Sequence, residues 1–453
     1  MLLINQEHQL PIFWQEGDAY SLFYAPGYLV VAARLLAADL WQDLQRPESQ
    51  TPAARRLRQW AETAVHTRQS ALTAPFAPVC LTLYLHNQCN LRCPYCYADP
   101  SPRSTPRLDV DTVHAAARLV AENCQQQQRP FTLVCHGGGE PTLNQPHLAQ
   151  VLAGVQAIAA AAALSLFRYI ATNGVMPTAK AHWLAQQFDL VGLSCDGPAA
   201  IQSRQRPLAN GQNSTPYVER TARILHEHQT PLHVRVTITP FSVMQQVEIA
   251  EYICRRLQPE EIHVEPVYRA GRARTAVLPD ADQFVDHFLQ AQQVAAAYGA
   301  RWLTSGSRLQ EIHGPYCHLF RDVLHLVPGD VASACFKTST SPQAGQQGLQ
   351  IGQMGDGRFT LNQPHITALR QQLHPLPPPC QDCFNQYHCA RDCPDNCPLE
   401  DGETAVPSFR CRVQKKLAQV QLTQMGAGLW AKARSQDGIA EGRVMTEIKR
   451  LGD

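Results

Sequence analysis

The segment VCLTLYLHNQCNLRCPYCY, residues 79–97, joins a strand pattern to a group of three cysteines. Apolar residues alternate with polar or small ones up to His86, which predicts a β-strand. Cys89, Cys93 and Cys96 follow, and Tyr97 closes the group. Three thiolates are one fewer than most iron–sulfur clusters and structural zinc sites use. The spacing therefore predicts a metal cluster with one position open to a substrate or cofactor.

The composition is that of a globular protein, except for its cysteines. The chain has 453 residues and a net charge of +1, which predicts two or three domains and no nucleic-acid partner. No apolar run reaches the length of a membrane span, and the N-terminus lacks a secretory pattern, so we expect no membrane partner and a cytoplasmic location. Sixteen cysteines, many at CxxC-type spacings, favour metal or iron–sulfur ligation in a reducing compartment.

Strand and helix patterns alternate six times through residues 79–300. Repeats of this kind predict a parallel sheet with crossover helices. We therefore expect an α/β protein whose central part is a partial (β/α)6, TIM-like barrel. In such folds the chemistry lies at the C-terminal ends of the strands.

Three further regions flank this barrel. Residues 1–78 read as a small α+β region, in which MLLINQ and LPIFWQ are candidate hairpin strands and 73–78, TAPFAP, is a linker. Residues 301–420 are rich in Cys, Pro and Gly, and metal clusters would stabilise such a loop-rich segment. Residues 421–453 are expected to be a helical tail, with 440–453 as a solvated helix.

Polar motifs follow three of the later strands. HGGGEPTL (136–143) follows the second, ATNG (171–174) the third and LSCDGPAAIQSRQR (193–206) the fourth. Glycines let a backbone approach a ligand closely, and Ser and Arg are suitable donors to a carboxylate. Each motif alone could also be an ordinary turn.

CxxxCxxC and an aromatic, placed after the first strand of a (β/α) repeat, resemble the radical S-adenosylmethionine (radical SAM) superfamily. The resemblance implies that Cys89, Cys93 and Cys96 hold a [4Fe–4S] cluster whose open iron binds SAM, and that SAM is cleaved to a 5′-deoxyadenosyl radical. GGEP and LSxDGP…R match further motifs of the family. They imply a SAM site made of Gly138, Gly139, Glu140, Pro141, Asn173, Ser194, Asp196 and Arg206.

The C-terminal cysteines resemble the SPASM extension of peptide-modifying radical SAM enzymes, which binds two auxiliary [4Fe–4S] clusters. The resemblance rests on Cys380-x2-Cys383-x5-Cys389-x3-Cys393, on Cys411 and on two upstream cysteines. It implies Cys317, Cys335 and Cys393 for the first auxiliary cluster and Cys380, Cys383, Cys389 and Cys411 for the second, hence three clusters in all. Zinc ribbons also use CxxC pairs.

Two departures from the family pattern bear on function. The stretch LQEIHGPY before Cys317 lacks the extra cysteine of relatives. The first auxiliary cluster could therefore have an open iron, or use His313, Cys397 or another ligand. Phe336 stands where sulfatase maturases carry an aspartate, a proposed base, which disfavours formylglycine formation.

The leading hypothesis is a radical SAM/SPASM enzyme that abstracts hydrogen from a ribosomally made precursor peptide. The product would be a crosslink, an epimer or an oxidised residue, with a flavodoxin- or ferredoxin-type electron donor as a second partner. One alternative is an anaerobic sulfatase maturase, and another is a non-catalytic iron–sulfur carrier or zinc scaffold. Residues 1–78 are either a winged-helix-like domain that binds a leader peptide or a packing extension of the barrel.

Overall fold

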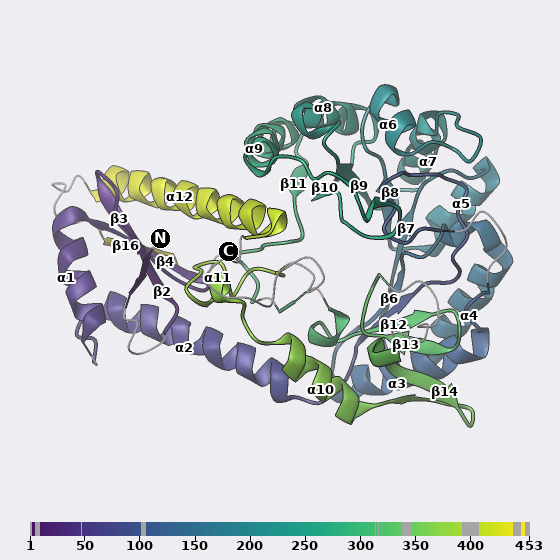
Figure 1. The fold of residues 1–453 in the computed structure, drawn as a ribbon, viewed down its shortest axis with the longest axis horizontal. Helices are drawn as coiled ribbons and strands as arrows, with labels where there is room; N and C mark the ends of the chain where they lie inside the picture. Colours follow the sequence, from purple (N-terminus) through teal and green to yellow (C-terminus); the bar gives the residue numbers. More distant parts are fainter. Residues whose placement is uncertain are drawn as a thin grey trace. The chain divides into compact units, whose positions relative to one another are not determined.

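The computed structural model describes residues 2–4, 10–46, 48–100, 106–312, 314–315, 317–337, 347–391, 407–437 and 445–448. The chain divides into two compact units (Figure 1). Unit 1 comprises Met1–Ala74, Gly306–Tyr316 and Gln371–Asp453, and unit 2 comprises Pro75–Ser305 and Cys317–Arg370. Within the described ranges, no helix is both long and apolar enough to cross a bilayer.

Unit 2 is built on a parallel sheet with crossover helices (Figure 1). Seven neighbouring strands run parallel, and helices connect them, which confirms the predicted α/β partial barrel. The strands are β5 (Cys80–Leu83), β6 (Phe131–Cys135), β7 (Leu166–Thr172), β8 (Leu190–Ser194), β9 (Leu232–Ile238), β10 (Glu261–Pro266) and β11 (Arg301–Leu303). The main connecting helices are α3 (Val110–Gln127), α4 (Gln145–Ala161), α5 (Thr178–Gln187), α7 (Thr215–Glu227), α8 (Gln246–Arg256) and α9 (Ala281–Ala297).

Local chemistry explains where these elements begin. The Asp109 carboxylate accepts from the backbone N–H of Asp111 and caps α3, as its position before the helix predicts. Asp280 caps α9 in the same way. Along β9, fully buried residues alternate with half-buried ones, so one face packs on the helices and the other faces the barrel interior.

The sheet of unit 2 extends beyond the barrel on the other side of β5. Strand β12 (Val323–Val327) pairs parallel to β5, and β13 (Val331–Ser333), β14 (Gln350–Gly355) and β15 (Arg358–Leu361) continue as an antiparallel meander before α10 (Gln363–Leu373). This pairing draws part of the predicted region 301–420 into the barrel unit. The break after Ala74 falls inside the predicted linker.

Unit 1 contains a five-stranded antiparallel sheet in the order β1-β2-β3-β4-β16. The strands are β1 (Leu2–Ile4), β2 (Ile12–Gln15), β3 (Tyr20–Ala25), β4 (Tyr28–Ala33) and β16 (Met445–Ile448), so the predicted N-terminal hairpin is confirmed. Helices α1 (Arg34–Gln45) and α2 (Pro52–Thr73) bury one face. Helix α12 (Phe409–Asp437) covers the other face, as Figure 1 shows.

The predicted helix over 440–453 is wrong for Met445–Ile448, which forms β16. This strand pairs antiparallel with β4, with Met445 opposite Ala32 and Ile448 opposite Leu29. The backbone of β4 offers a row of hydrogen-bonding groups at the sheet edge, and a distant segment satisfies them. Local pattern could not reveal this pairing, because the partner lies some four hundred residues away.

Buried histidines in both units, among them His86 and His388, make stability dependent on pH. His86 and His388 are 4% and 1% exposed, and desolvation lowers the pKa of each to about 4. The unfolded chain binds these protons more tightly, so the stabilisation is complete above pH 6.5 and is lost as the pH falls toward 4. We expect the free energy of unfolding to fall by about 1.4 kcal/mol per pH unit per histidine.

Urea unfolding at neutral pH and near pH 5 measures this slope. His86→Gln and His388→Gln should each flatten it, whereas His66→Gln, on an exposed face of α2, should leave it unchanged. Equal slopes in all four proteins would contradict the assignment.

Candidate functional site

The three cysteines lie on the loop after β5, at the C-terminal end of the barrel strands. Their thiols influence one another electrostatically, which places them around a common space. Desolvation raises the pKa of Cys89 to about 11 and that of Cys93 to about 12, and the negative charge of neighbouring cysteines raises both further. A metal cluster bound here would have to displace protons from these thiols.

A structural zinc site would need a fourth ligand beside these three thiols. Three thiolates instead match the protein ligands of a [4Fe–4S] cluster whose fourth iron is open.

The three glycines after β6 lie directly against the cysteine loop. The N–H of Gly139 donates to the His86 carbonyl at 2.9 Å, and the N–H of Glu140 donates to the Gln88 carbonyl at 2.8 Å. A Cβ on Gly139 would lie 1.9 Å from the Gln88 oxygen, and one on Gly137 would lie 2.2 Å from the Tyr84 ring. The segment is therefore glycine-rich because it packs on the backbone that leads into the cysteines.

Gly139→Ala is expected to displace the cysteine loop and to lower the free energy of unfolding by about 1–3 kcal/mol, the usual cost of overpacking. Thermal unfolding measures the loss, and the iron content of reconstituted protein should fall with it. Gly355→Ala is the matched control, because a Cβ there meets open space. Equal stability of the two variants would contradict this packing.

The Glu140 side chain joins the ends of β6 and β7. It is 2% exposed and accepts hydrogen bonds from the Thr142 N–H, the Thr142 hydroxyl, the Thr172 hydroxyl and the Asn173 N–H, at 2.7 to 3.2 Å. Desolvation raises the pKa of Glu140, while these donors oppose the shift. Both carboxylate oxygens serve internal bonds, so Glu140 holds the strand ends in place.

Asn173 connects the end of β7 to the cysteine loop. Its amide donates to the Asn90 side-chain oxygen at 2.8 Å and to the Cys89 sulfur at 3.7 Å. Asn90 in turn donates to the Val175 carbonyl at 2.8 Å. The predicted SAM ligand Asn173 is thus also a support for a cysteine ligand.

Asp196 and Arg206 form a buried ion pair beside the cysteines. Asp196 is fully buried, and its carboxylate lies 3.1 Å from the Arg206 Nε. Tyr95, between Cys93 and Cys96, donates its hydroxyl to Asp196, and the Arg206 guanidinium lies 5.4 Å from the Tyr95 ring centre. Burial acts to lower the pKa of Arg206, but Asp196 outweighs it and the pKa is raised.

The structure therefore brings the predicted residues together at one end of the barrel. The ends of β6, β7 and β8 each send polar groups toward the loop that carries the cysteines. Ser194, the last residue of β8, is half-buried at the same edge and pairs in register with Arg235. The assignment of individual SAM contacts stays a prediction.

Sequence reasoning named Tyr97 and Phe336 but missed Tyr84 and the contacts that join these aromatic groups. The Tyr84 hydroxyl lies 3.0 Å from the Tyr97 hydroxyl and donates to the Phe336 carbonyl at 2.6 Å. The Phe336 ring contacts Tyr97 and Tyr268 edge-on, with ring centres 5.9 and 6.2 Å apart. The alternation along β5 could have indicated Tyr84, which follows the strand on its inner face.

Arg235 places a positive charge in the barrel interior. Desolvation acts to lower its pKa, but the neighbouring Tyr169 and Glu265 side chains raise it. The Glu265 carboxylate also accepts from Ser305 N–H and hydroxyl groups at 2.8 and 2.6 Å. Arg235 is therefore an interior cation.

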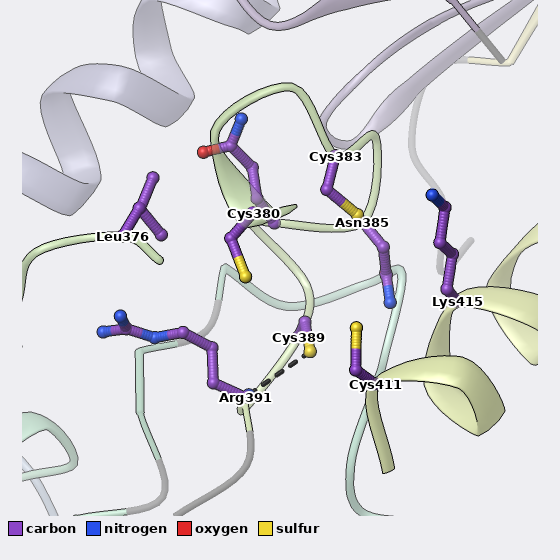
Figure 2. A pocket seen from close by; sticks show the side chains of 9 residues that line it. Leu376, Cys380, Cys383, Asn385, Cys389, Arg391, Cys411 and Lys415 are labelled. Atoms are coloured by element: carbon purple, nitrogen blue, oxygen red, sulfur yellow. Dashed lines mark hydrogen bonds between the residues drawn. The ribbon is translucent and has the colours of Figure 1, made fainter. Parts of the chain in front are cut away.

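A second cysteine group lies in unit 1. Cys380, Cys383, Cys389 and Cys411 line one pocket with Arg391 and Lys415, and Figure 2 shows the four thiols directed into a common space. The Arg391 N–H donates to the Cys389 sulfur at 3.3 Å. Desolvation raises the pKa of Cys389, and the other three cysteines raise it further. The four predicted ligands of the second auxiliary cluster thus lie together beside two cations.

The first auxiliary set is only partly described. Cys317 and Cys335 belong to unit 2, and the Cys335 N–H donates to the Ser333 hydroxyl at 3.2 Å. Cys393, His313 and Cys397 lie outside the described residues. This ligand set stays a prediction.

His233, Glu261 and His263 form the third candidate metal group, at the N-terminal ends of β9 and β10. The His263 Nε2 lies 2.9 Å from the Glu261 carboxylate. Arg301 also pairs with Glu261, so a cation already balances the carboxylate. The group lies at the opposite strand ends from the cysteine loop and has no part in its chemistry.

Comparison with known proteins agrees with this geometry. Residues 83–253 match the radical SAM superfamily. The serine-type anaerobic sulfatase-maturating enzyme of Klebsiella aerogenes is 25% identical over 151 residues, which cover 33% of this chain and 37% of that enzyme. The chain thus matches little more than a third of that relative's length.

Solved structures share the fold over most of the chain. Native anSMEcpe with bound AdoMet and Cp18Cys peptide superposes with a TM-score of 0.59 at 14% identity, over 78% of this chain and 99% of that one. SuiB of Streptococcus suis bound to the precursor peptide SuiA gives 0.53 at 12% identity, over 91% and 100%. At these identities the likeness establishes the fold.

Proposed function

We propose, from the match of residues 83–253 to the radical SAM superfamily, that the chain modifies a ribosomally made precursor peptide. The observation that carries the proposal is the cysteine loop, held at the C-terminal strand ends by the Glu140 N–H, Asn173 and Asp196. A [4Fe–4S] cluster on Cys89, Cys93 and Cys96, when bound, supplies the electron that cleaves SAM to a 5′-deoxyadenosyl radical.

The residues around the loop suit the carboxylate and the ammonium group of the amino-acid part of SAM. Arg206 and Ser194 are donors for its carboxylate. Because Glu140 is occupied by internal bonds, the ammonium group would bind the backbone carbonyls of Gly138 and Gly139. Figure 2 supports a second auxiliary cluster on Cys380, Cys383, Cys389 and Cys411, and Cys317, Cys335 and Cys393 are proposed for the first.

A peptide substrate is supported by the relatives whose structures hold one, anSMEcpe and SuiB. The barrel interior offers aromatic and cationic surface, from Tyr97, Tyr268, Phe336 and Arg235, against which a peptide could pack. Residues 1–78 are proposed to bind its leader segment. A flavodoxin- or ferredoxin-type protein would supply electrons.

Sulfatase maturation is the second candidate, because the Klebsiella relative is named as a sulfatase-maturating enzyme. Phe336 argues against it, since its ring packs among aromatic side chains and carries no group that accepts a proton.

The test is incubation of reduced, reconstituted protein with SAM. Formation of 5′-deoxyadenosine supports the proposal, and its absence, with or without peptide, would favour a non-catalytic carrier. About twelve irons per chain would support three clusters, and about eight or four would leave out one or both auxiliary clusters.

Co-expression with a small reading frame beside the gene then identifies the substrate. A loss of two hydrogens from the peptide indicates a crosslink or an oxidation, and an unchanged mass indicates an epimer.

A further inference from the structure

Two histidines and a glutamate face one another where β9 and β10 begin. His233 is paired in register with Glu261 on the neighbouring strand, and His263 lies two residues after Glu261. Residues two apart on a strand point to the same face of the sheet. Val234 and Ile262, which alternate with these polar residues, are fully buried on the side that packs on the helices. The three polar side chains therefore share the face that lines the barrel interior.

The donor atoms of this group are close enough to share one metal ion. The His233 Nδ1 lies 3.5 Å and the His263 Nε2 lies 2.9 Å from the same carboxylate oxygen of Glu261, Oε2. One donor atom from each residue lies within 4.8 Å of the other two. A tetrahedral zinc site with bonds of about 2.0–2.2 Å places its donor atoms about 3.4 Å apart. Small rotations of the two imidazole rings would complete this geometry.

The surroundings also suit a bound cation. The side chains of His233, Glu261 and His263 are only 17%, 13% and 19% exposed. Burial lowers the pKa of His233, which favours the neutral imidazole that binds metals, and the charge of Glu260 opposes that of Arg301 around it. Arg301 pairs with Oε1 of Glu261 and so can hold the carboxylate in place while Oε2 binds the ion.

The donor set selects the class of metal. Two imidazoles and one carboxylate are used by zinc sites that keep a fourth position for water. Ferrous iron uses the same three ligands, but a site of nitrogen and oxygen donors generally binds zinc more tightly than iron. The cysteine loop lies at the opposite ends of the strands, so an ion bound here would be separate from the clusters.

We propose that His233, Glu261 and His263 form a zinc-binding site on the interior face of the barrel, with one coordination position left to water. The ion would join β10 to β9 at the start of their parallel ladder and would stabilise this end of the barrel. The site goes beyond the radical chemistry proposed above and does not depend on it.

The first test uses the full chain with its clusters reconstituted, dialysed against a zinc chelator and then titrated with Zn²⁺. We expect one tightly bound zinc per chain, whose X-ray absorption shows nitrogen and oxygen neighbours at about 2.0–2.1 Å and no sulfur at about 2.3 Å. Zinc and iron absorb at different edges, so the clusters do not obscure the signal, and iron analysis of the same sample shows that they are intact. A sulfur shell would place the zinc among the cysteines and overturn the proposal, as would the absence of bound zinc.

Substitutions assign the site to these residues. His233→Gln and His263→Gln should each weaken zinc binding by more than about 100-fold, because losing a residue that only supports a metal ligand already costs about 10–100-fold. Competition with a fluorescent zinc chelator measures the change. His182→Gln is the matched control: His182 and His228 also bring two imidazole nitrogens together, at 2.9 Å, but belong to no three-ligand group among the described residues. Equal zinc affinity in all four proteins would overturn the proposal.

Thermal unfolding gives a readout that does not depend on the stability of a variant. Zinc should raise the unfolding midpoint of the unaltered chain, because it binds the folded state, but not that of Glu261→Gln. Each protein is compared with itself, with and without zinc, so a loss of stability from the substitution cancels. An equal rise in both proteins would show that Glu261 is not a ligand and would overturn the site as proposed.

Discussion

Cys93→Ala is expected to abolish the formation of 5′-deoxyadenosine from SAM and to remove about four irons from each reconstituted chain. With this thiol gone, two cysteines remain on a loop that the three strand ends hold in a fixed position. Two thiolates leave two irons of a [4Fe–4S] cluster without a protein ligand, so the cluster should not persist. Iron analysis and quantification of 5′-deoxyadenosine measure the two effects on the same sample.

Two matched variants separate this loss from general damage. Cys254→Ala removes a buried thiol on α8 that belongs to no cysteine group, and should keep both iron and activity. Cys383→Ala should remove about four irons from the pocket of Figure 2 while SAM cleavage persists, because that pocket and the cysteine loop have no residue in common and belong to different units. If Cys93→Ala retained iron and activity, the open-iron assignment would be wrong.

The partial barrel was predictable because its signals are local. Each strand and helix carries its own periodicity, and the positions of the cysteines, glycines and Asp196 at strand ends follow from the order of elements. The spacing of Cys380, Cys383 and Cys389 likewise predicts a shared site, and the structure brings them together with Cys411.

The roles of the supporting residues were not predictable in this way. Glu140 and Asn173 were expected as ligand contacts, yet their hydrogen bonds join segments that lie 32 and 84 residues apart. Whether a polar side chain faces a ligand or a neighbouring loop depends on packing between elements, which a motif does not encode. The pairings of β12 with β5 and of β16 with β4 were missed for the same reason, because both are short strands with distant partners.

Asp196→Ala is expected to lower the free energy of unfolding by about 3–5 kcal/mol, because it leaves the buried Arg206 guanidinium without its counter-charge. The variant also removes the acceptor of the Tyr95 hydroxyl, the Gln205 amide and the Thr237 N–H. Since Tyr95 lies between two of the cysteine ligands, iron incorporation should fall together with stability. Denaturant unfolding and iron analysis measure the two losses.

Two comparisons show whether the cost comes from the unpaired charge. Glu227→Ala breaks an exposed pair with Arg223, at 3.9 Å, and should cost less than about 1 kcal/mol. The double variant Asp196→Ala, Arg206→Met removes both buried charges, and should recover part of the stability lost in Asp196→Ala. If Asp196→Ala cost no more than Glu227→Ala, the buried pair would not be what holds the cysteine loop to the end of β8, and Arg206 would be left with SAM binding as its sole proposed role.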